Sequence, residues 1–296
     1  MSVARDLAAK GANVIVVARS TDKLQKTVEK MHAAAKNPGQ QRFHYITADV
    51  SVPDYATGLI EEATRWNHNQ PLDIVWCLAG FSTPSLLLDM PMSELKRHMN
   101  VNFYGCAELS LAILRVWLAP EFPIEEQARH LILTASTAVC CVVPGFGPYT
   151  PTKFAVRGFA DTIATELLLY PQNVKLHLLL PGSIATEGMD RENLTKPEIT
   201  KILEETDPFE TPDYVSKHAI RALERGEHFI TTNWLTAVMK WSSMGTSYRN
   251  NWITDTLGIW LASLFWIFGR ITLDGQIRGY AKKHGHPANY PKKTLA

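Results

Sequence analysis

The stretch HLILTASTAVCCVVPGFGPYTPTK, residues 130–153, decides the fold. It opens with an apolar, β-rich run at residues 130–136 and ends in a helical pattern that begins near Tyr149. Similar runs recur along the chain with helical patterns between them, at residues 13–19, 43–49, 73–80, 175–182 and 228–232. Nearly continuous apolar runs of this length are typical of parallel strands that helices cover on both faces. The sequence therefore predicts an α/β fold built on a doubly wound parallel sheet.

Helix start signals support this alternation of strands and helices. Ser20 precedes one helical pattern, Pro53 opens the next, and Thr211 precedes a third. No repeat or linker interrupts the chain before about residue 232. We therefore expect one domain at residues 1–232 and a C-terminal segment of different composition at residues 233–296.

Composition excludes several classes of protein. The chain has 296 residues, and 46% of them are hydrophobic, which provides for a large buried core and excludes a disordered scaffold. Its 30 basic and 29 acidic residues leave a formal net charge of +1, so we do not expect nucleic acid as a partner. The four cysteines show no Cys-x-x-Cys spacing, and we expect them to be reduced.

Four polar residues form a candidate catalytic group. Tyr149 and Lys153 are four positions apart at the start of a helix, so their side chains share one face. Ser136 ends a strand at the edge where open α/β sheets bind ligands, and Asn102 lies in the long helical pattern before that strand. We expect the Lys153 ammonium to lower the pKa of the Tyr149 phenol, which would exchange a proton with a substrate oxygen held by Ser136. The alternative is a capping serine and a packing tyrosine.

The order of these residues resembles the short-chain dehydrogenase/reductase family, over residues 1 to about 232. Residues 77–80, Cys-Leu-Ala-Gly, stand where Asn-Asn-Ala-Gly is usual, and residues 181–186 resemble the loop that closes on the nicotinamide. The resemblance implies a Rossmann-like fold and a catalytic tetrad of Asn102, Ser136, Tyr149 and Lys153, in which Asn102 would hold a water of the proton relay. It implies cofactor contacts from Arg19, Lys23, Asp49, Val50, Gly80, Tyr149, Lys153, Pro181, Gly182 and Ile184.

Arg19 indicates which cofactor the chain prefers. At the end of the second strand of this fold, a carboxylate binds the ribose 2′-hydroxyl of NAD, whereas a guanidinium pairs with the 2′-phosphate of NADP. Arg19 stands there, and Lys23 follows one helical turn later, although such a lysine more commonly lies on a solvated helix face. We therefore expect NADPH and a reductive reaction.

Within the family, several segments resemble the fungal 3-dehydrosphinganine (3-ketosphinganine) reductases. They are residues 196–204, 211–213 and 229–232, together with the aromatic C-terminal segment. Residues 196–204 lie where family members keep a substrate lid, and their alternative is an ordinary surface helix with Pro197 in its first turn. The resemblance implies reduction of a long-chain keto-sphingoid base in sphingolipid synthesis. Other lipid, steroid or retinoid ketones are the alternative substrates.

One part of the family pattern is missing from this sequence. The first strand and its Thr-Gly-x-x-x-Gly-x-Gly turn do not occur, because residues 2–7 align with the helix that follows that turn. We expect an unpaired gap in the middle of the sheet and a weaker hold on the cofactor pyrophosphate. The two explanations are a sequence that starts late and a non-catalytic dehydrogenase-like scaffold.

The C-terminal segment stands out by its aromatic residues. Residues 256–269 carry no charge, and Trp and Phe residues gather around them. These 14 residues fall short of the roughly 20 that a spanning helix needs, so we expect a segment that lies in the membrane interface. With the reductase resemblance, this places the protein at the endoplasmic reticulum membrane with its catalytic domain facing the cytosol. The alternative is a helix packed on the domain or in a homo-oligomer interface.

Two motifs in the tail carry less weight. His284 and His286 lack a third ligand, so no metal site is expected. Lys292 and Lys293 resemble a dilysine signal for the endoplasmic reticulum, with a register that is off by one.

Overall fold

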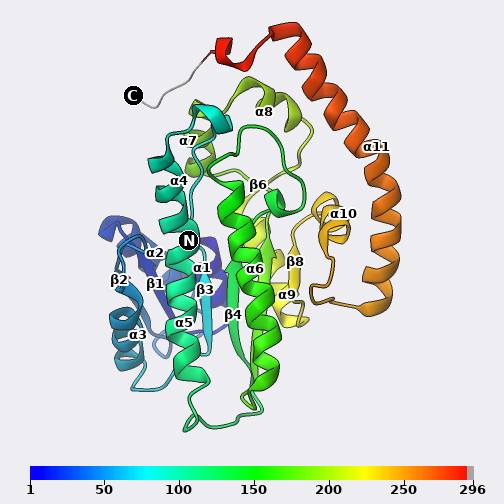
Figure 1. The fold of residues 1–296 in the computed structure, drawn as a ribbon. Helices are drawn as coiled ribbons and strands as arrows, with labels where there is room; N and C mark the ends of the chain where they lie inside the picture. The colour runs from blue at the N-terminus through cyan, green and yellow to red at the C-terminus, as the bar shows by residue number, and fades with distance from the viewer. Residues whose placement is uncertain (292–296) are drawn as a thin grey trace.

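The computed structural model describes residues 1–291 and confirms the α/β fold (Figure 1). A parallel strand begins within one residue of the start of each predicted run: β1 (Val14–Ala18), β2 (Phe43–Thr47), β3 (Ile74–Cys77), β4 (Arg129–Thr134), β5 (Val174–Leu180) and β8 (Phe229–Thr231). β1 pairs with β2, and the other four follow the order β3-β4-β5-β8. Strands β4 and β5 are buried along most of their length because helices cover both faces.

Helices lie between the strands and after the last strand. They are α1 (Ser2–Ala9), α2 (Thr21–Ala34), α3 (Tyr55–Trp66), α4 (Met92–Met99), α5 (Gly105–Trp117), α6 (Thr150–Glu166), α7 (Glu187–Thr195), α8 (Glu198–Leu203), α9 (Pro212–Glu224), α10 (Trp234–Ser243) and α11 (Trp252–His284). Helices α5 and α6 cover one face of the sheet, where Trp117, Leu131 and Leu178 belong to the main core (Figure 1). Helix α9 covers the other face, where Ala219 contacts a smaller core that includes Ile230.

A gap divides the sheet, as the missing first strand predicts. Within residues 1–291, β1 pairs only with β2, and the β3 edge that faces away from β4 has no strand partner. Helices hold the two parts together instead: α3 packs on α5, and α1 packs on both α2 and α9. Two ion pairs join α1 to α9, from Arg5 to Asp213 at 3.0 Å and from Lys10 to Glu224 at 2.5 Å.

The helix starts agree with the sequence signals at two of three places. Ser20 and Thr211 cap α2 and α9 by accepting hydrogen bonds from backbone N–H groups. Helix α3 begins at Tyr55 and so starts later than Pro53 predicts. Asp54 precedes it with a left-handed backbone, φ 63°, which aspartate tolerates better than most residues.

Two features close to the predicted site have no counterpart in the sequence pattern. Strands β6 (Ser183–Ile184) and β7 (Phe209–Glu210) form a short parallel pair that joins the segment after β5 to the segment after α8. A π-helical turn, Asn100–Tyr104, separates α4 from α5, so the expected long helix is interrupted at Asn102. Turns of this kind occur frequently at functional sites.

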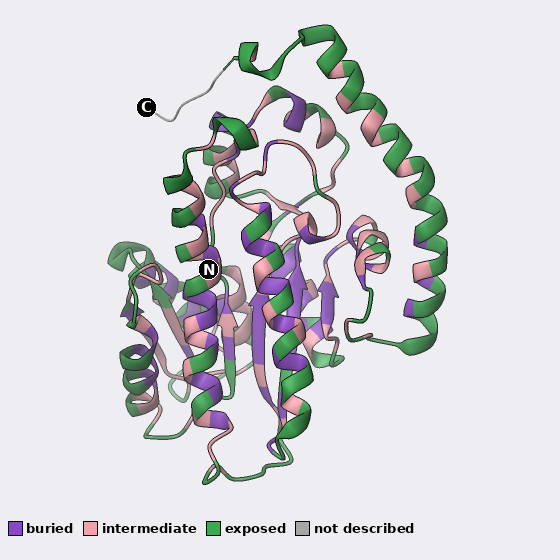
Figure 2. Ribbon diagram, in the orientation of Figure 1, coloured by how far each residue is buried: buried purple, intermediate pink, exposed green. Residues whose placement is uncertain are grey.

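The C-terminal segment ends in a long, exposed helix (Figure 2). Helix α11 has 33 residues, about 50 Å at 1.5 Å per residue, and packs on α10 and α8. Of the 18 consecutive residues in its most apolar part, 11% are buried, and the side chains of Trp260, Leu264 and Phe268 are exposed. Packing on the domain therefore accounts for only part of this helix. The helix is also longer than the expected segment, and by length and composition it could cross a membrane.

A buried ion pair fastens the base of α11 to α10. The Lys240 ammonium lies 3.3 Å from the Asp255 carboxylate, and both side chains are almost inaccessible. Asp255 also accepts a hydrogen bond from Trp241 Nε1 at 2.8 Å. The indole lies against Gly258, where a Cβ would overlap the ring. These contacts fix the direction in which α11 leaves the domain.

Gly105 lets α5 approach the loop after β2, which gives a test of the packing. A Cβ at this position would lie 2.6 Å from the Val50 carbonyl oxygen. We expect Gly105→Ala to lower the free energy of unfolding by about 2 kcal/mol, because overpacking against backbone forces it to shift. Gly158→Ala in α6 is the control: nothing lies within 4 Å of its Cβ, so stability should be kept or rise by up to about 1 kcal/mol. Urea unfolding measures both, and equal stabilities would contradict the packing argument.

Candidate active site

Tyr149 and Lys153 begin helix α6, as the spacing predicts. Tyr149 directly precedes the helix, and the Lys153 Nζ lies 5.6 Å from the centre of the Tyr149 ring. Lys153 is 4% exposed and donates a hydrogen bond to the Thr134 carbonyl oxygen at 3.0 Å. Its ammonium therefore reaches from α6 to the end of β4.

Ser136 lies two residues after β4 and faces the start of α6. Its hydroxyl interacts with the Tyr149 phenol by a hydrogen bond. The same oxygen accepts the Ala138 N–H at 3.2 Å and caps the short 3-10 turn Thr137–Val139. The capping role and the contact with Tyr149 thus coexist in one side chain.

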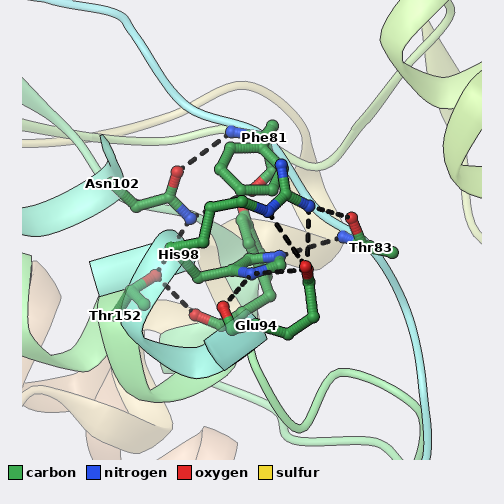
Figure 3. Close-up of polar contacts among 8 residues, drawn as sticks. Phe81, Thr83, Glu94, His98, Asn102 and Thr152 are labelled. Carbon is green, nitrogen blue, oxygen red and sulfur yellow. Dashed lines mark hydrogen bonds and ion pairs between the residues drawn. The ribbon is translucent and has the colours of Figure 1, made fainter. Parts of the chain in front are cut away.

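Asn102 is the buried centre of a hydrogen-bond network (Figure 3). Its Oδ1 accepts the Phe81 N–H and its Nδ2 donates to the Phe81 carbonyl oxygen, both at 3.0 Å. Nδ2 also donates to Thr152 Oγ1 at 3.1 Å, and that hydroxyl donates to the Tyr149 carbonyl oxygen at 2.7 Å. The amide therefore joins the loop after β3 to the start of α6.

His98 extends the network by one helical turn (Figure 3). The side chain is fully buried, its Nε2 accepts the Thr83 N–H at 3.0 Å, and its Nδ1 lies 2.8 Å from the Glu94 carbonyl oxygen. These partners fix the neutral tautomer with the proton on Nδ1, and burial lowers the pKa of the ring. Arg97 lies 4.2 Å from the centre of the Phe81 ring and donates to Thr83 Oγ1 at 3.1 Å. Helix α4 therefore clamps the loop after β3.

That loop passes close to Lys153, the predicted catalytic lysine. A Cβ on Gly80 would lie 3.4 Å from both Asn102 Oδ1 and Lys153 Nζ. Glycine at this position keeps the backbone close to both groups without pressing on them. The geometry is compatible with the predicted place of Gly80 beside a cofactor.

The protonation of the pair differs from the expectation. Burial raises the pKa of Tyr149 to about 12, although the Ser136 hydrogen bond lowers it and the nearby Glu192 carboxylate raises it. Burial lowers the pKa of Lys153 to about 8. The predicted lowering of the Tyr149 pKa is therefore wrong for this structure, because desolvation of the phenolate dominates and the ammonium is directed at the Thr134 carbonyl. The phenol of Tyr149 is therefore neutral at pH 7.

The residues predicted for the adenosine end of the cofactor lie at the ends of β1 and β2. Arg19 has a side chain that is 75% exposed and lies 3.8 Å from Asp49. The Ser51 N–H and hydroxyl donate to Asp49 Oδ1 at 2.9 and 2.7 Å and hold the pKa of that carboxyl below its usual value. Lys23 pairs with Glu187, at the start of α7, at 2.8 Å.

The residues predicted for the nicotinamide end lie beside the catalytic group. The Thr137 N–H donates to the Pro181 carbonyl oxygen at 3.1 Å, which ties this loop to the turn after β4. Gly182 gives room to Asn233, whose Nδ2 would lie 3.1 Å from a Cβ there. Ile184 follows in β6 and is partly exposed.

These residues fit a nicotinamide dinucleotide at both of its ends. Arg19 and Val50 follow neighbouring strands at the adenosine end, while Gly80 leaves a backbone cradle against Lys153 at the other. Within residues 1–291, the gap between β1 and β3 lies between the two ends. No glycine-rich turn stands there in the described part of the chain.

Several residues of this site were not predicted from the sequence. Thr152 and His98 carry hydrogen bonds that position the tetrad, and Phe81 supplies the backbone groups that Asn102 holds. His98 had a signal, because it lies four positions before Asn102 and so shares its helix face. Glu192 had none, since a glutamate in a polar helix reads as a solvated residue.

The remaining expectations concern cysteines and metals. All four cysteines are free thiols. Among residues 1–291, no cluster of three or more His, Cys, Asp or Glu could hold a metal ion. His284 instead stacks on Tyr280 at a ring distance of 4.0 Å. Lys292 and Lys293 lie outside the described residues.

Comparison with known sequences agrees with this geometry. Residues 1–197 match the family model of the short chain dehydrogenases. The chain is 47% identical to the 3-ketodihydrosphingosine reductase gsl-3 of Neurospora crassa over 296 residues, which cover 99% of this chain and 82% of that protein. It is 37% identical to the 3-ketodihydrosphingosine reductase ksrA of Aspergillus fumigatus, over 98% of this chain and 84% of that protein.

Solved structures share the fold. A short-chain dehydrogenase/reductase from Burkholderia phymatum in complex with NAD superposes with a TM-score of 0.68 at 20% identity, over 81% of this chain and 86% of that one. A short-chain dehydrogenase from Sphingobium yanoikuyae in complex with NADPH gives a TM-score of 0.66 at 16% identity, over 82% and 87%. Sequence and fold together show that the chain is an oxidoreductase and belongs to the short-chain dehydrogenase/reductase family.

Proposed function

We propose that this chain reduces the ketone of 3-ketodihydrosphingosine, also called 3-dehydrosphinganine, with NADPH in sphingolipid synthesis. One observation carries the proposal: Asn102, Ser136, Tyr149 and Lys153 meet at the start of α6 in a chain that is 47% identical to a reductase of that name. The second fungal relative carries the same substrate in its name. These names favour a sphingoid ketone over the other lipid, steroid and retinoid ketones.

Tyr149 and Ser136 supply the donors for the ketone oxygen. The bound dinucleotide would supply the hydride to the carbonyl carbon. Tyr149, neutral because its pKa is about 12, gives its phenolic proton to the oxygen as charge develops there, while Ser136 fixes that oxygen with a hydrogen bond. Lys153, whose pKa is about 8, is mostly charged at pH 7 and favours the phenolate that remains.

Arg19 supports NADPH as the cofactor. Its guanidinium extends into solvent at the end of β1, and its ion pair with Asp49 is long, at 3.8 Å. A guanidinium at this place can form bidentate hydrogen bonds with a 2′-phosphate. Lys23 is engaged with Glu187, so Arg19 carries the preference in our proposal.

Helix α11 supports a membrane location. Its exposed apolar side chains, among them Trp260 and Phe268, form a surface of the kind that marks membrane or protein contacts. Lys282 and Lys283 lie near its end, where they can face anionic lipids. A long-chain substrate that resides in the bilayer favours the membrane, and we place the helix in the endoplasmic reticulum with the catalytic domain on the cytosolic side.

The proton donor can be tested with Tyr149→Phe. We expect the rate of ketone reduction to fall by about 10² to 10⁴-fold, because general acid catalysis contributes that much, while NADPH affinity stays the same. Tyr170→Phe is the matched control, since Tyr170 is exposed and precedes β5 at the opposite edge of the sheet. Steady-state rates and cofactor titration measure the two quantities. A Tyr149→Phe variant that keeps more than about a tenth of the rate would contradict the assignment.

The cofactor preference can be tested with Arg19→Asp. The substitution replaces a phosphate partner with a group that repels phosphate and accepts a hydrogen bond from a ribose hydroxyl. We expect the ratio of kcat/KM for NADPH to kcat/KM for NADH to fall by about 10-fold or more, as for loss of a charged hydrogen bond. Arg65→Asp, at an exposed position of α3, should leave the ratio unchanged. The same ratio in both variants would mean that Arg19 does not touch the cofactor.

The membrane location can be tested on the full chain. We expect the protein to stay with membranes through a high-salt wash and to be released by detergent. Replacing Leu261 and Phe268 with Asp should release it into the soluble fraction, because an acidic side chain costs about 2.5 to 3.5 kcal/mol in the middle of a membrane helix. Leu168 and Leu169, also exposed but outside α11, receive the same replacements as a control. Equal fractionation of both variants would remove the support for a membrane helix.

A further inference from the structure

A buried charge cluster surrounds Lys196, the first residue of the predicted lid at residues 196–204. The Lys196 ammonium lies 3.0 Å from Glu192 of α7 and 2.6 Å from Glu204, which follows α8. The side chains are 3% exposed for Lys196 and 15% and 16% exposed for the two carboxylates. Lys196 is therefore not a solvated lysine.

The charges of this cluster do not balance. Two carboxylates share one ammonium, and Asp207 adds a third acidic group, whose pKa burial and Glu204 raise to about 6. Burial also raises the pKa of Glu192, against the opposing effect of Lys196. A surplus of negative charge in a poorly solvated site is costly unless a cation joins it.

Glu192 lies close enough to Tyr149 to act on it electrostatically. Its charge raises the pKa of the Tyr149 phenol. The neighbouring Lys196 Nζ lies 5.6 Å from the centre of the Phe146 ring, which is 6.0 Å from the Tyr149 ring. The ion pair of Glu192 and Lys196 is therefore packed beside the rings that lead to Tyr149.

The lid is anchored to the segment that leads into Tyr149. The Thr200 hydroxyl of α8 donates to the Pro144 carbonyl oxygen at 2.7 Å. Gly145, with a φ of +103°, makes this approach possible, because a Cβ there would overlap the Thr200 side chain. The position of Glu192 relative to Tyr149 is therefore built into the fold.

We propose that Glu192 binds the ammonium group of the substrate and so selects amino ketones over uncharged ketones. This inference rests on the proposed function. The amino group of 3-ketodihydrosphingosine is bonded to the carbon next to the ketone, so a ketone held by Tyr149 and Ser136 brings its ammonium beside the same residues. Bound there, the cation offsets the surplus charge of the lid and forms a charged hydrogen bond with Glu192.

The test compares two ketones on the same enzyme. The first is 3-ketodihydrosphingosine, and the second is 1-hydroxyoctadecan-3-one, which has the same chain and ketone without the amino group. We expect Glu192→Gln to lower kcat/KM for the amino ketone by about 10 to 100-fold and to change that for the uncharged ketone by less than about 3-fold. Glu192→Asp, which keeps the charge, should recover part of the loss. Glu198→Gln, at an exposed position of α8, should affect neither substrate.

The outcomes separate the inference from the function on which it rests. Equal losses on both ketones would show that Glu192 only holds Lys196 and the lid in place, and no loss on either would show that the ammonium binds elsewhere. Both results overturn the inference while leaving the reductase intact. Failure of the unsubstituted chain to reduce 3-ketodihydrosphingosine while it reduces the uncharged ketone would overturn both. Thermal unfolding of each variant confirms that the compared proteins are folded.

Discussion

One buried carboxamide holds the catalytic region together. Asn102 pairs with both backbone polar groups of Phe81 and passes a third contact through Thr152 to the Tyr149 carbonyl. A shorter or apolar side chain would leave the Phe81 N–H and C=O groups without partners, at a cost of about 1 to 3 kcal/mol for each buried group. The loop after β3 and the start of α6 therefore move as one unit. Asn102 lies in the π-helical turn Asn100–Tyr104, so the backbone departs from α-helical geometry at this residue.

Contacts between helices, rather than strand pairing, join the two parts of the sheet. The facing edges of β1 and β3 are unpaired within residues 1–291, and unpaired edges would let the two halves drift apart. Helix α3 prevents this on one side, because the Tyr55 hydroxyl donates to the Gly105 carbonyl oxygen at 2.6 Å. Since Gly105 also touches Val50, the end of β2 is fixed to the start of α5. These contacts fix the position of the adenosine end of the predicted dinucleotide site relative to its nicotinamide end.

Features that depend on neighbouring residues in the chain, such as strands and helix faces, were predicted from the sequence. Features that depend on tertiary packing, such as burial and pKa, were not. Apolar runs gave the parallel strands, and the four-residue spacing of Tyr149 and Lys153 placed both on one helix face. The pKa of Tyr149 was predicted in the wrong direction, because burial by distant segments outweighs a nearby charge. The burial of Lys196 could not be predicted, because the carboxylates that pair with it, Glu192 and Glu204, are brought together only by the fold. The length of α11 was underestimated because a helix continues through polar residues that end an uncharged run.

The lid connects the catalytic residues to the proposed membrane helix. Helix α8 is bonded to the segment before Tyr149 through Thr200, and it also packs on α11. The Lys240–Asp255 ion pair fixes the base of α11 to the domain. The position of the predicted lid relative to the proposed membrane surface is therefore set by packed contacts and not by a flexible linker. In the proposed reaction a lipid can then present its polar end to the site while its chain stays along apolar surface. The hydrocarbon need not be transferred through water, so binding energy is left for orienting the ketone.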